Sequence, residues 1–230
     1  MYNVAVERSA GWSGIAFIIV VIVAAFLPGA PPAPDAPAAT VGAFIDASHG
    51  MWMLAAWLTF PGVAFFLWWL VQLRAYLRLV PQVDDGLPTY MLAGGVVAGT
   101  IVILTATVQV VLGMHPSTDR GPQVITMLYD TFNAFGAMIF IPTAVMVFAG
   151  SHSGRRHQSL PSGLVYLGYL ATVGSAISTL SVFSTSGFMA VGGLGTLVLG
   201  LLPFAVWVVW TSIVLIRAPR AGEARASGAQ

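Results

Sequence analysis

The sequence predicts an all-α, single-domain integral membrane bundle of six transmembrane helices, with the N- and C-termini on the cytoplasmic side. Three observations lead to this fold class: the composition, six long apolar segments, and the placement of the arginines. Of the 230 residues, 57% are hydrophobic and only 7% are charged, whereas a soluble domain carries about 25% charged residues. Too little charge remains to coat a water-facing surface, so lipid is the expected solvent.

The six apolar segments have the length of membrane-spanning helices, about 17 to 25 residues or somewhat more. None shows the two-residue alternation of a membrane β-barrel, and Pro- or Gly-containing connections separate them. The expected helices are 12–27, 44–79, 87–114, 123–149, 162–188 and 190–216. The last residues, 218–230, are expected to form a flexible cytoplasmic tail.

The first segment has a second interpretation. Residues 14–27, GIAFIIVVIVAAFL, precede a proline-rich stretch and resemble a signal peptide with its cleavage region. The positive charge before it is weak, because Glu7 offsets Arg8. A retained first helix is therefore favoured, and cleavage would leave five helices with an external N-terminus.

The arginines set the predicted orientation, because positive residues favour cytoplasmic loops. With the N-terminus inside, one arginine, Arg120, lies outside, and eight lie inside: Arg8, Arg74, Arg78, Arg155, Arg156, Arg217, Arg220 and Arg225. This predicts a multi-pass protein of a cytoplasmic (plasma) membrane. Its partners are the lipid bilayer and either further copies of the chain or another membrane protein. A net charge of +1 offers no basic surface for nucleic acid, and the lack of cysteine excludes disulfides and zinc–thiolate sites.

One proline interrupts each of the second, fourth and sixth segments. Pro61, Pro142 and Pro203 precede the next cytoplasmic arginine by 13, 13 and 14 residues, or about 20 Å of helix. Proline removes a helical hydrogen bond and favours a kink. Three kinks at one depth suggest three similar helical hairpins, although prolines are frequent enough in membrane helices for coincidence.

The same count places a set of polar side chains near the outer interface. Asp130 and His49 each lie 12 residues before a proline, and Asp46 lies one turn from His49 on the expected second helix. The candidate ligand-binding residues are Asp46, His49, Gln109, Asp130 and Asn133. Imidazole with carboxylates also suits a metal ion, and the candidate ligands are Asp46, His49, His115 and Asp130.

These polar residues have plainer interpretations as well. Asp46 or Ser48 can cap a helix, and Asp130 can favour the positive end of another. Haem held by His49 and His115 is disfavoured, because His115 precedes Pro116 in a loop. No catalytic residue is assigned, since no G-x-x-x-x-G-K, H-E-x-x-H, G-x-S-x-G or C-x-x-C motif occurs.

Two further residue classes are expected to be structural. Small and hydroxylated residues at helical spacing, including Gly95, Gly99, Ser175, Gly192 and Gly200, favour close helix packing over a permeation path. The tryptophans are expected to anchor the helices, some of them in an aromatic belt at the interface. They are Trp12, Trp52, Trp57, Trp68, Trp69, Trp207 and Trp210.

About a third of the chain resembles a family of small bacterial polytopic membrane proteins known only as a domain of unknown function. The matching features are an acid and small polar residues opening a helix, a proline, a basic loop and the pattern P-x-x-L-x-x-L-G. These residues are Asp130, Asn133, Gly136, Pro142, Pro161, Leu164, Leu167 and Gly168. The resemblance implies a six-helix protein of a bacterial cytoplasmic (inner) membrane, and it implies no activity.

The sequence leaves three functions open. The first is binding or transport of a small molecule, lipid or ion through an outward-facing polar vestibule. The second is a non-catalytic assembly subunit of a membrane complex, and the third is a metal-dependent membrane enzyme. The absence of catalytic motifs favours a protein that is not an enzyme.

Overall fold

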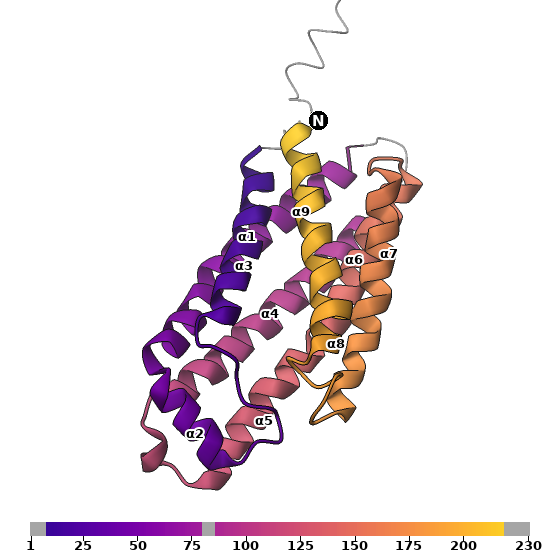
Figure 1. The fold of residues 1–230 in the computed structure, drawn as a ribbon. Coiled ribbons are helices and arrows are strands. Elements are labelled where there is room, and N and C mark those ends of the chain that lie inside the picture. The colour runs from indigo at the N-terminus through magenta and orange to yellow at the C-terminus, as the bar shows by residue number, and fades with distance from the viewer. Residues whose placement is uncertain (1–7, 80–85, 219–230) are drawn as a thin grey trace, which may run out of the picture.

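The computed structural model describes residues 8–79 and 86–218, and within these residues the chain is all-helical (Figure 1). Six helical stretches are long and apolar enough to cross a membrane. They are Arg8–Phe26, His49–Leu77, Leu87–Gly113, Pro122–Arg156, Ser162–Phe183 and Leu194–Arg217. The remaining apolar helix, α2 (Ala38–Ala47), has only 10 residues.

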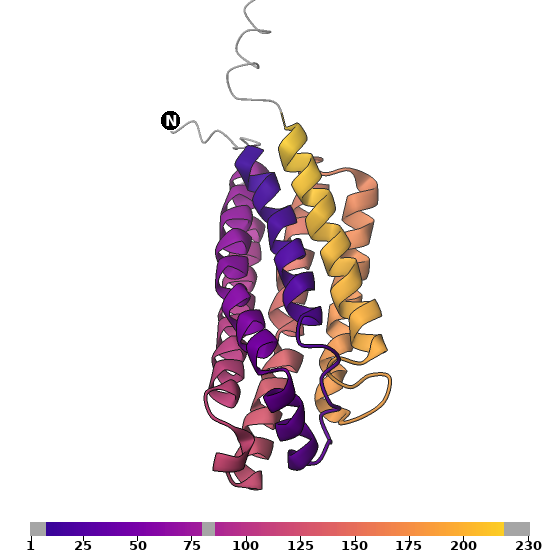
Figure 2. The ribbon, with the colours of Figure 1, turned by 60° about the vertical axis from the view of Figure 1, so that its left-hand side comes forward.

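The helices of these six stretches, called spanning helices here for their length and apolar character alone, form a closed ring in chain order. Their labels and bounds are α1 (Arg8–Phe26), α3 (His49–Leu77), α4 (Leu87–Gly113), α5 (Pro122–Met138), α6 (Phe140–Arg156), α7 (Ser162–Ser178) and α9 (Leu202–Arg217). Each packs on its neighbour in the order α1, α3, α4, α6, α7, α9, and α9 also packs along α1 (Figures 1 and 2). The first and last spanning helices therefore lie side by side and close the bundle.

The two ends of the bundle differ in charge. We call the inner end the one where α1 begins and α9 ends (Figure 1), and the outer end the one that carries α2 and η1 (Ser117–Asp119). The last turns of α3, α6 and α9 bring Arg74, Arg155, Arg156 and Arg217 to the inner end. Arg120 follows η1 at the outer end. Arg220, Arg225 and the predicted tail, apart from Ala218, lie outside the described residues.

The second predicted segment, 44–79, is two helices rather than one. Helix α2 ends at Ala47, Ser48 leaves the helical conformation with φ −105° and ψ 13°, and α3 begins at His49. Ser48 does not cap α3, since its hydroxyl donates back to the Phe44 carbonyl of α2 at 2.7 Å. The expectation that Asp46 and His49 share one helical face was therefore wrong.

The fourth segment is also interrupted at a defined place. Helix α5 ends at Met138 and α6 begins at Phe140, with the break between them three residues before Pro142. Proline lacks the N–H that would bond to the carbonyl four residues earlier, so the helix is weakened there. Helix α6 then runs to Arg156, which makes the first part of the expected loop helical.

The last two segments are shorter than predicted at the outer end. Helix α7 ends at Ser178, and a 3₁₀ turn, η2 (Thr179–Phe183), follows it. The final helix starts at Leu194 with α8 (Leu194–Thr196), so Gly192, with φ +75°, is a turn residue and not part of a helical stripe. A π-helical turn, η3 (Leu197–Leu201), then precedes Pro203, whose missing N–H leaves the Leu199 carbonyl without its usual partner.

The inner half of the bundle is a packed aromatic core. Trp69 of α3 and Trp207 of α9 are fully buried, and their rings meet edge to face with centroids 5.9 Å apart. Trp52 is also buried. These three tryptophans therefore do not lie on the surface of the bundle as anchors, contrary to the sequence expectation. Trp12, Trp57, Trp68 and Trp210 are exposed, as lipid-facing anchors would be.

Glycines allow the close helix contacts that the small-residue patterns predicted. A Cβ on Gly95 of α4 would meet Leu70 of α3 and Met146 of α6. A Cβ on Gly174 of α7 would overlap the Leu199 carbonyl oxygen of η3. The small-residue faces are thus used between helices of this chain.

Candidate functional site: an apolar cavity in the outer half

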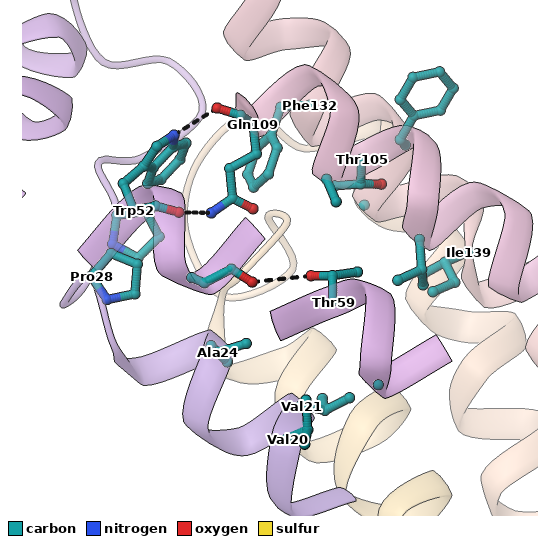
Figure 3. A pocket seen from close by; sticks show the side chains of 18 of the residues that line it. Val20, Val21, Ala24, Pro28, Trp52, Thr59, Thr105, Gln109, Phe132 and Ile139 are labelled. Carbon is teal, nitrogen blue, oxygen red and sulfur yellow. Dashed lines mark hydrogen bonds between the residues drawn. The ribbon is translucent and has the colours of Figure 1, made fainter. Parts of the chain in front are cut away.

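A cavity of about 330 Å³ lies between the helices in the outer half of the bundle. Its wall comes from α1, α3, α4, α5 and the start of α9, and Val20, Ala24, Thr59, Thr105 and Phe132 represent it in Figure 3. Spanning helices from both halves of the sequence therefore converge on one space.

The cavity wall is almost entirely apolar, and among the described residues no charged side chain lines it. Two lining threonines use their hydroxyl protons within their own helices. Thr59 Oγ1 donates to the Ala55 carbonyl at 3.2 Å, and Thr105 Oγ1 donates to the Ile101 carbonyl at 2.9 Å. This back-bonding removes two hydrogen-bond donors from the cavity.

Trp52 of α3 and Gln109 of α4 form a reciprocal pair on the cavity wall (Figure 3). The Trp52 indole N–H donates to the Gln109 backbone carbonyl at 2.8 Å. The Gln109 side-chain Nε2 donates to the Trp52 backbone carbonyl at 2.9 Å. The two bonds fix α3 against α4 and hold both side chains in place beside the cavity.

The connection between α1 and α2, which we call the strap (27–37), covers part of the cavity. In Figure 1 it is the dark loop that leaves α1, reaches toward α5 and returns to α2. Pro28, Gly29 and Pro31 line the cavity. The Tyr129 hydroxyl of α5 donates to the Pro32 carbonyl at 2.5 Å and ties the strap to the opposite wall.

Asp46, a predicted ligand-binding and metal-binding residue, has a structural partner. Its carboxylate accepts hydrogen bonds from the Ser117 hydroxyl at 2.5 Å and from the Ser117 backbone N–H at 3.1 Å. The Ser117 N–H begins η1 and has no partner within that turn. Asp46 therefore holds α2 to η1, and it does not line the cavity.

The side chains of His49 and Arg120 close the outer end of α4. His49 Nε2 lies 2.9 Å from the Gly113 carbonyl and donates to it in the tautomer that carries the proton there. Arg120 donates to the Leu112 carbonyl at 3.1 Å and to the Val111 carbonyl at 2.7 Å. The last carbonyls of a helix lack helical partners and carry partial negative charge, so both side chains satisfy the end of α4.

Asp130 and Asn133 lie on α5 outside the cavity wall. Asp130 is exposed and borders a shallow hollow made by α5 alone, beside residues such as Gln123 and Thr126. Asn133 Nδ2 donates to the Tyr129 carbonyl one turn earlier at 2.9 Å. Of the five predicted ligand-binding residues, Gln109 is the one that lines the cavity.

The predicted metal ligands are not gathered into one centre. Within residues 8–79 and 86–218, no group of three or more His, Cys, Asp or Glu side chains is placed to hold a metal ion. Asp46 and His49 are bonded to Ser117 and Gly113, and His115 is exposed after α4. The metal and haem hypotheses therefore gain no geometric support from these residues.

Sequence reasoning missed most of the cavity wall. Most lining residues lie in continuous apolar runs, and the sequence does not show which face of each helix points toward the cavity. Examples are Trp52, Thr59, Thr105 and Phe132. The available signal was Gln109, an uncharged polar residue within an apolar segment. Such a residue usually faces the bundle interior and hydrogen-bonds across helices.

The chain was compared with protein-family models, with curated proteins and with solved structures, and nothing matched in any of the three comparisons. The resemblance of residues 130–168 to a six-helix family of unknown function thus stays an interpretation of the residues.

Proposed function

We propose that this chain is an integral membrane protein that binds an apolar small molecule or lipid chain in its outer-half cavity. The six apolar stretches span the bilayer, and the arginine-rich inner end faces the cytoplasm. The cavity then lies in the outer leaflet, beneath the strap. The single observation that carries the proposal is a partly open apolar cavity lined by α1, α3, α4, α5 and α9.

The size and lining of the cavity support an apolar occupant. Binding sites for small molecules are mostly apolar and range from about 300 to 1,000 Å³, and this cavity is about 330 Å³. Apolar cavities of about half this volume stay dry and take up apolar guests. An ion or hydrated solute would lose its hydration without any charged group to replace it.

The other two functions receive less support. The small-residue faces expected to dock a partner are occupied by contacts within the chain, as at Gly95 and Gly174. The candidate metal ligands are not grouped among the described residues. Binding of an apolar ligand therefore fits the geometry best.

Photolabelling tests the proposal. The purified protein in lipid nanodiscs is exposed to a dodecane that carries a diazirine, illuminated and mapped by mass spectrometry. We expect saturable labelling of lining residues such as Val20, Thr59 and Phe132, and competition by unlabelled dodecane.

A matched pair of variants controls for labelling from the bilayer. Ala24→Phe places a ring in the cavity, whereas Ala64→Phe adds the same ring to an exposed position on α3. Ala24→Phe should lower cavity labelling about tenfold or more, a loss of about 1.4 kcal/mol in affinity, and Ala64→Phe should not. Non-saturable labelling confined to outward-facing residues such as Ile19 and Val71 would contradict the proposal.

A further inference from the structure

The cavity wall carries a side-chain carbonyl oxygen, Gln109 Oε1, to which no described residue donates. Gln109 uses its Nε2 for the Trp52 carbonyl, and no described residue donates to its Oε1. Figure 3 shows this oxygen turned toward the space between Thr59 and Thr105. The neighbouring hydroxyls cannot supply a proton, because both donate within their own helices.

The orientation of the Gln109 carboxamide follows from its partner. The Trp52 backbone carbonyl can only accept a hydrogen bond, so the amide group that faces it must be the NH₂ group. Turning the carboxamide over would place two carbonyl oxygens 2.9 Å apart. Oε1 therefore points away from Trp52 and faces the cavity.

An acceptor held against an apolar space favours one kind of ligand. Leaving a polar atom unpaired in apolar surroundings costs free energy. A site that offers a fixed acceptor discriminates against analogues that lack the matching donor, because the acceptor is then left unsatisfied. Trp52 holds Gln109 in position, so the acceptor is preorganised.

We propose that the cavity selects apolar molecules that carry a hydroxyl group, and that Gln109 Oε1 accepts the hydrogen bond from that hydroxyl. This inference rests on the proposed function, since it names the class of ligand for the same cavity. The ligand class is a long-chain or cyclic alcohol: its apolar body fills the space beside α1 and α5, and its hydroxyl lies at the Gln109 end. Gln109 is the specificity-determining residue.

Competition against the dodecane photoprobe tests this selectivity. The competitors are 1-dodecanol, which donates and accepts, and 1-methoxydodecane, which only accepts, compared at equal mole fractions in the bilayer. In the wild-type protein we expect the alcohol to compete about two- to tenfold better than the ether, as one net hydrogen bond allows. Equal competition by the alcohol and the ether would overturn the inference. This is the result expected if a water molecule, and not the ligand, donates the hydrogen bond to Gln109 Oε1.

Two variants test whether Gln109 is responsible for the preference for the alcohol over the ether. Gln109→Met removes the acceptor with little change in size and should make the alcohol and the ether equal competitors. Thr105→Val removes a neighbouring hydroxyl whose proton is used within its helix but whose oxygen can still accept; if Gln109 is the acceptor, the preference should stay intact. A preference that survives Gln109→Met would contradict the assignment.

The wild-type comparison does not depend on the folding of a variant, so the inference is testable even if Gln109→Met is unstable. Failure of the proposed function has a different signature, because dodecane itself would then fail to compete with its photoprobe. A cavity that binds alkane, ether and alcohol alike would keep the proposed function and exclude the selectivity.

Discussion

At the scale of single residues, the polar side chains of the outer end mainly satisfy backbone groups. Asp46 serves the Ser117 N–H, while His49 and Arg120 serve the last carbonyls of α4. Such groups are costly to leave unpaired near lipid, where little water can replace the lost partner. The position of these polar residues is therefore explained by helix ends, and no ligand is needed to account for them.

Arg120 should contribute measurably to stability, because it bonds two carbonyls of α4 at once. Arg120→Met should lower the free energy of unfolding by about 1–3 kcal/mol, in the range for hydrogen bonds to charged groups. Arg120→Lys should recover part of the loss, since lysine keeps the charge without the two-pronged geometry. Chemical denaturation in mild detergent, followed by circular dichroism, measures the change.

Asp130→Asn is the matched control for Arg120→Met. Asp130 is exposed at the same end, and no described residue donates a hydrogen bond or forms an ion pair with it. Its replacement should change the free energy of unfolding by no more than about 0.5 kcal/mol. An equal loss in both variants would contradict the capping role of Arg120.

At the scale of elements, the three prolines have different effects on their helices, although each lies 13 or 14 residues before an arginine of the inner end. Pro61 lies inside an uninterrupted α3, Pro142 follows the break between α5 and α6, and Pro203 follows the π-helical turn η3. The Leu199 carbonyl of this π turn lies against Gly174 of α7. The missing proline N–H thus has consequences for packing between helices as well as within one.

Gly174→Ala tests this close approach of backbone to backbone. A methyl group there would overlap the Leu199 carbonyl oxygen, and backbone cannot swing aside as a side chain can. We expect a loss of about 2–4 kcal/mol, at the upper end for single substitutions, measured by chemical denaturation in detergent.

Gly50→Ala provides the comparison, because it makes the same chemical change in α3 where a Cβ meets nothing within 4 Å. Alanine is the better helix former, so this variant should be neutral or slightly more stable. A tolerated Gly174→Ala would mean that α7 and η3 lie further apart than described.

The sequence predicts the elements better than it predicts the site. Continuous apolar runs reveal the six helical stretches that are long and apolar enough to cross a membrane, and Pro and Gly mark most of their ends. The break at Ser48 escapes prediction because the weak helix formers Asp46, Ser48 and Gly50 are each single residues among better ones, and no proline marks the helix end. The cavity escapes because its wall depends on which faces of five helices meet, and Val20 or Phe132 looks the same in sequence whether it faces lipid or the interior.

At the scale of the whole molecule, the ring of helices has an apolar outer surface and a division of roles along its axis. Outward-facing residues such as Ile22, Phe65 and Leu170 are exposed and apolar, as lipid contact requires. The inner half is filled by the Trp69–Trp207 core, and the outer half holds the cavity. A molecule entering the cavity therefore meets a packed floor, which favours binding over passage across the bundle.

The proposed orientation is open to cysteine labelling, because the chain has no native cysteine. Thr118→Cys, exposed in η1, should react with a membrane-impermeant maleimide on intact cells. Ser162→Cys, exposed at the start of α7, should react only after the cells are permeabilised. The reverse pattern would place the cavity in the cytoplasmic leaflet.

The central claim is that the outer half of the bundle contains a partly open apolar cavity that accepts an apolar guest. A crystal structure under xenon pressure tests it most directly, since xenon enters dry apolar cavities. We expect a xenon peak between Thr59, Thr105 and Phe132, with any ordered water confined to Gln109 Oε1. A chain of ordered waters through this space, without xenon, would contradict the claim.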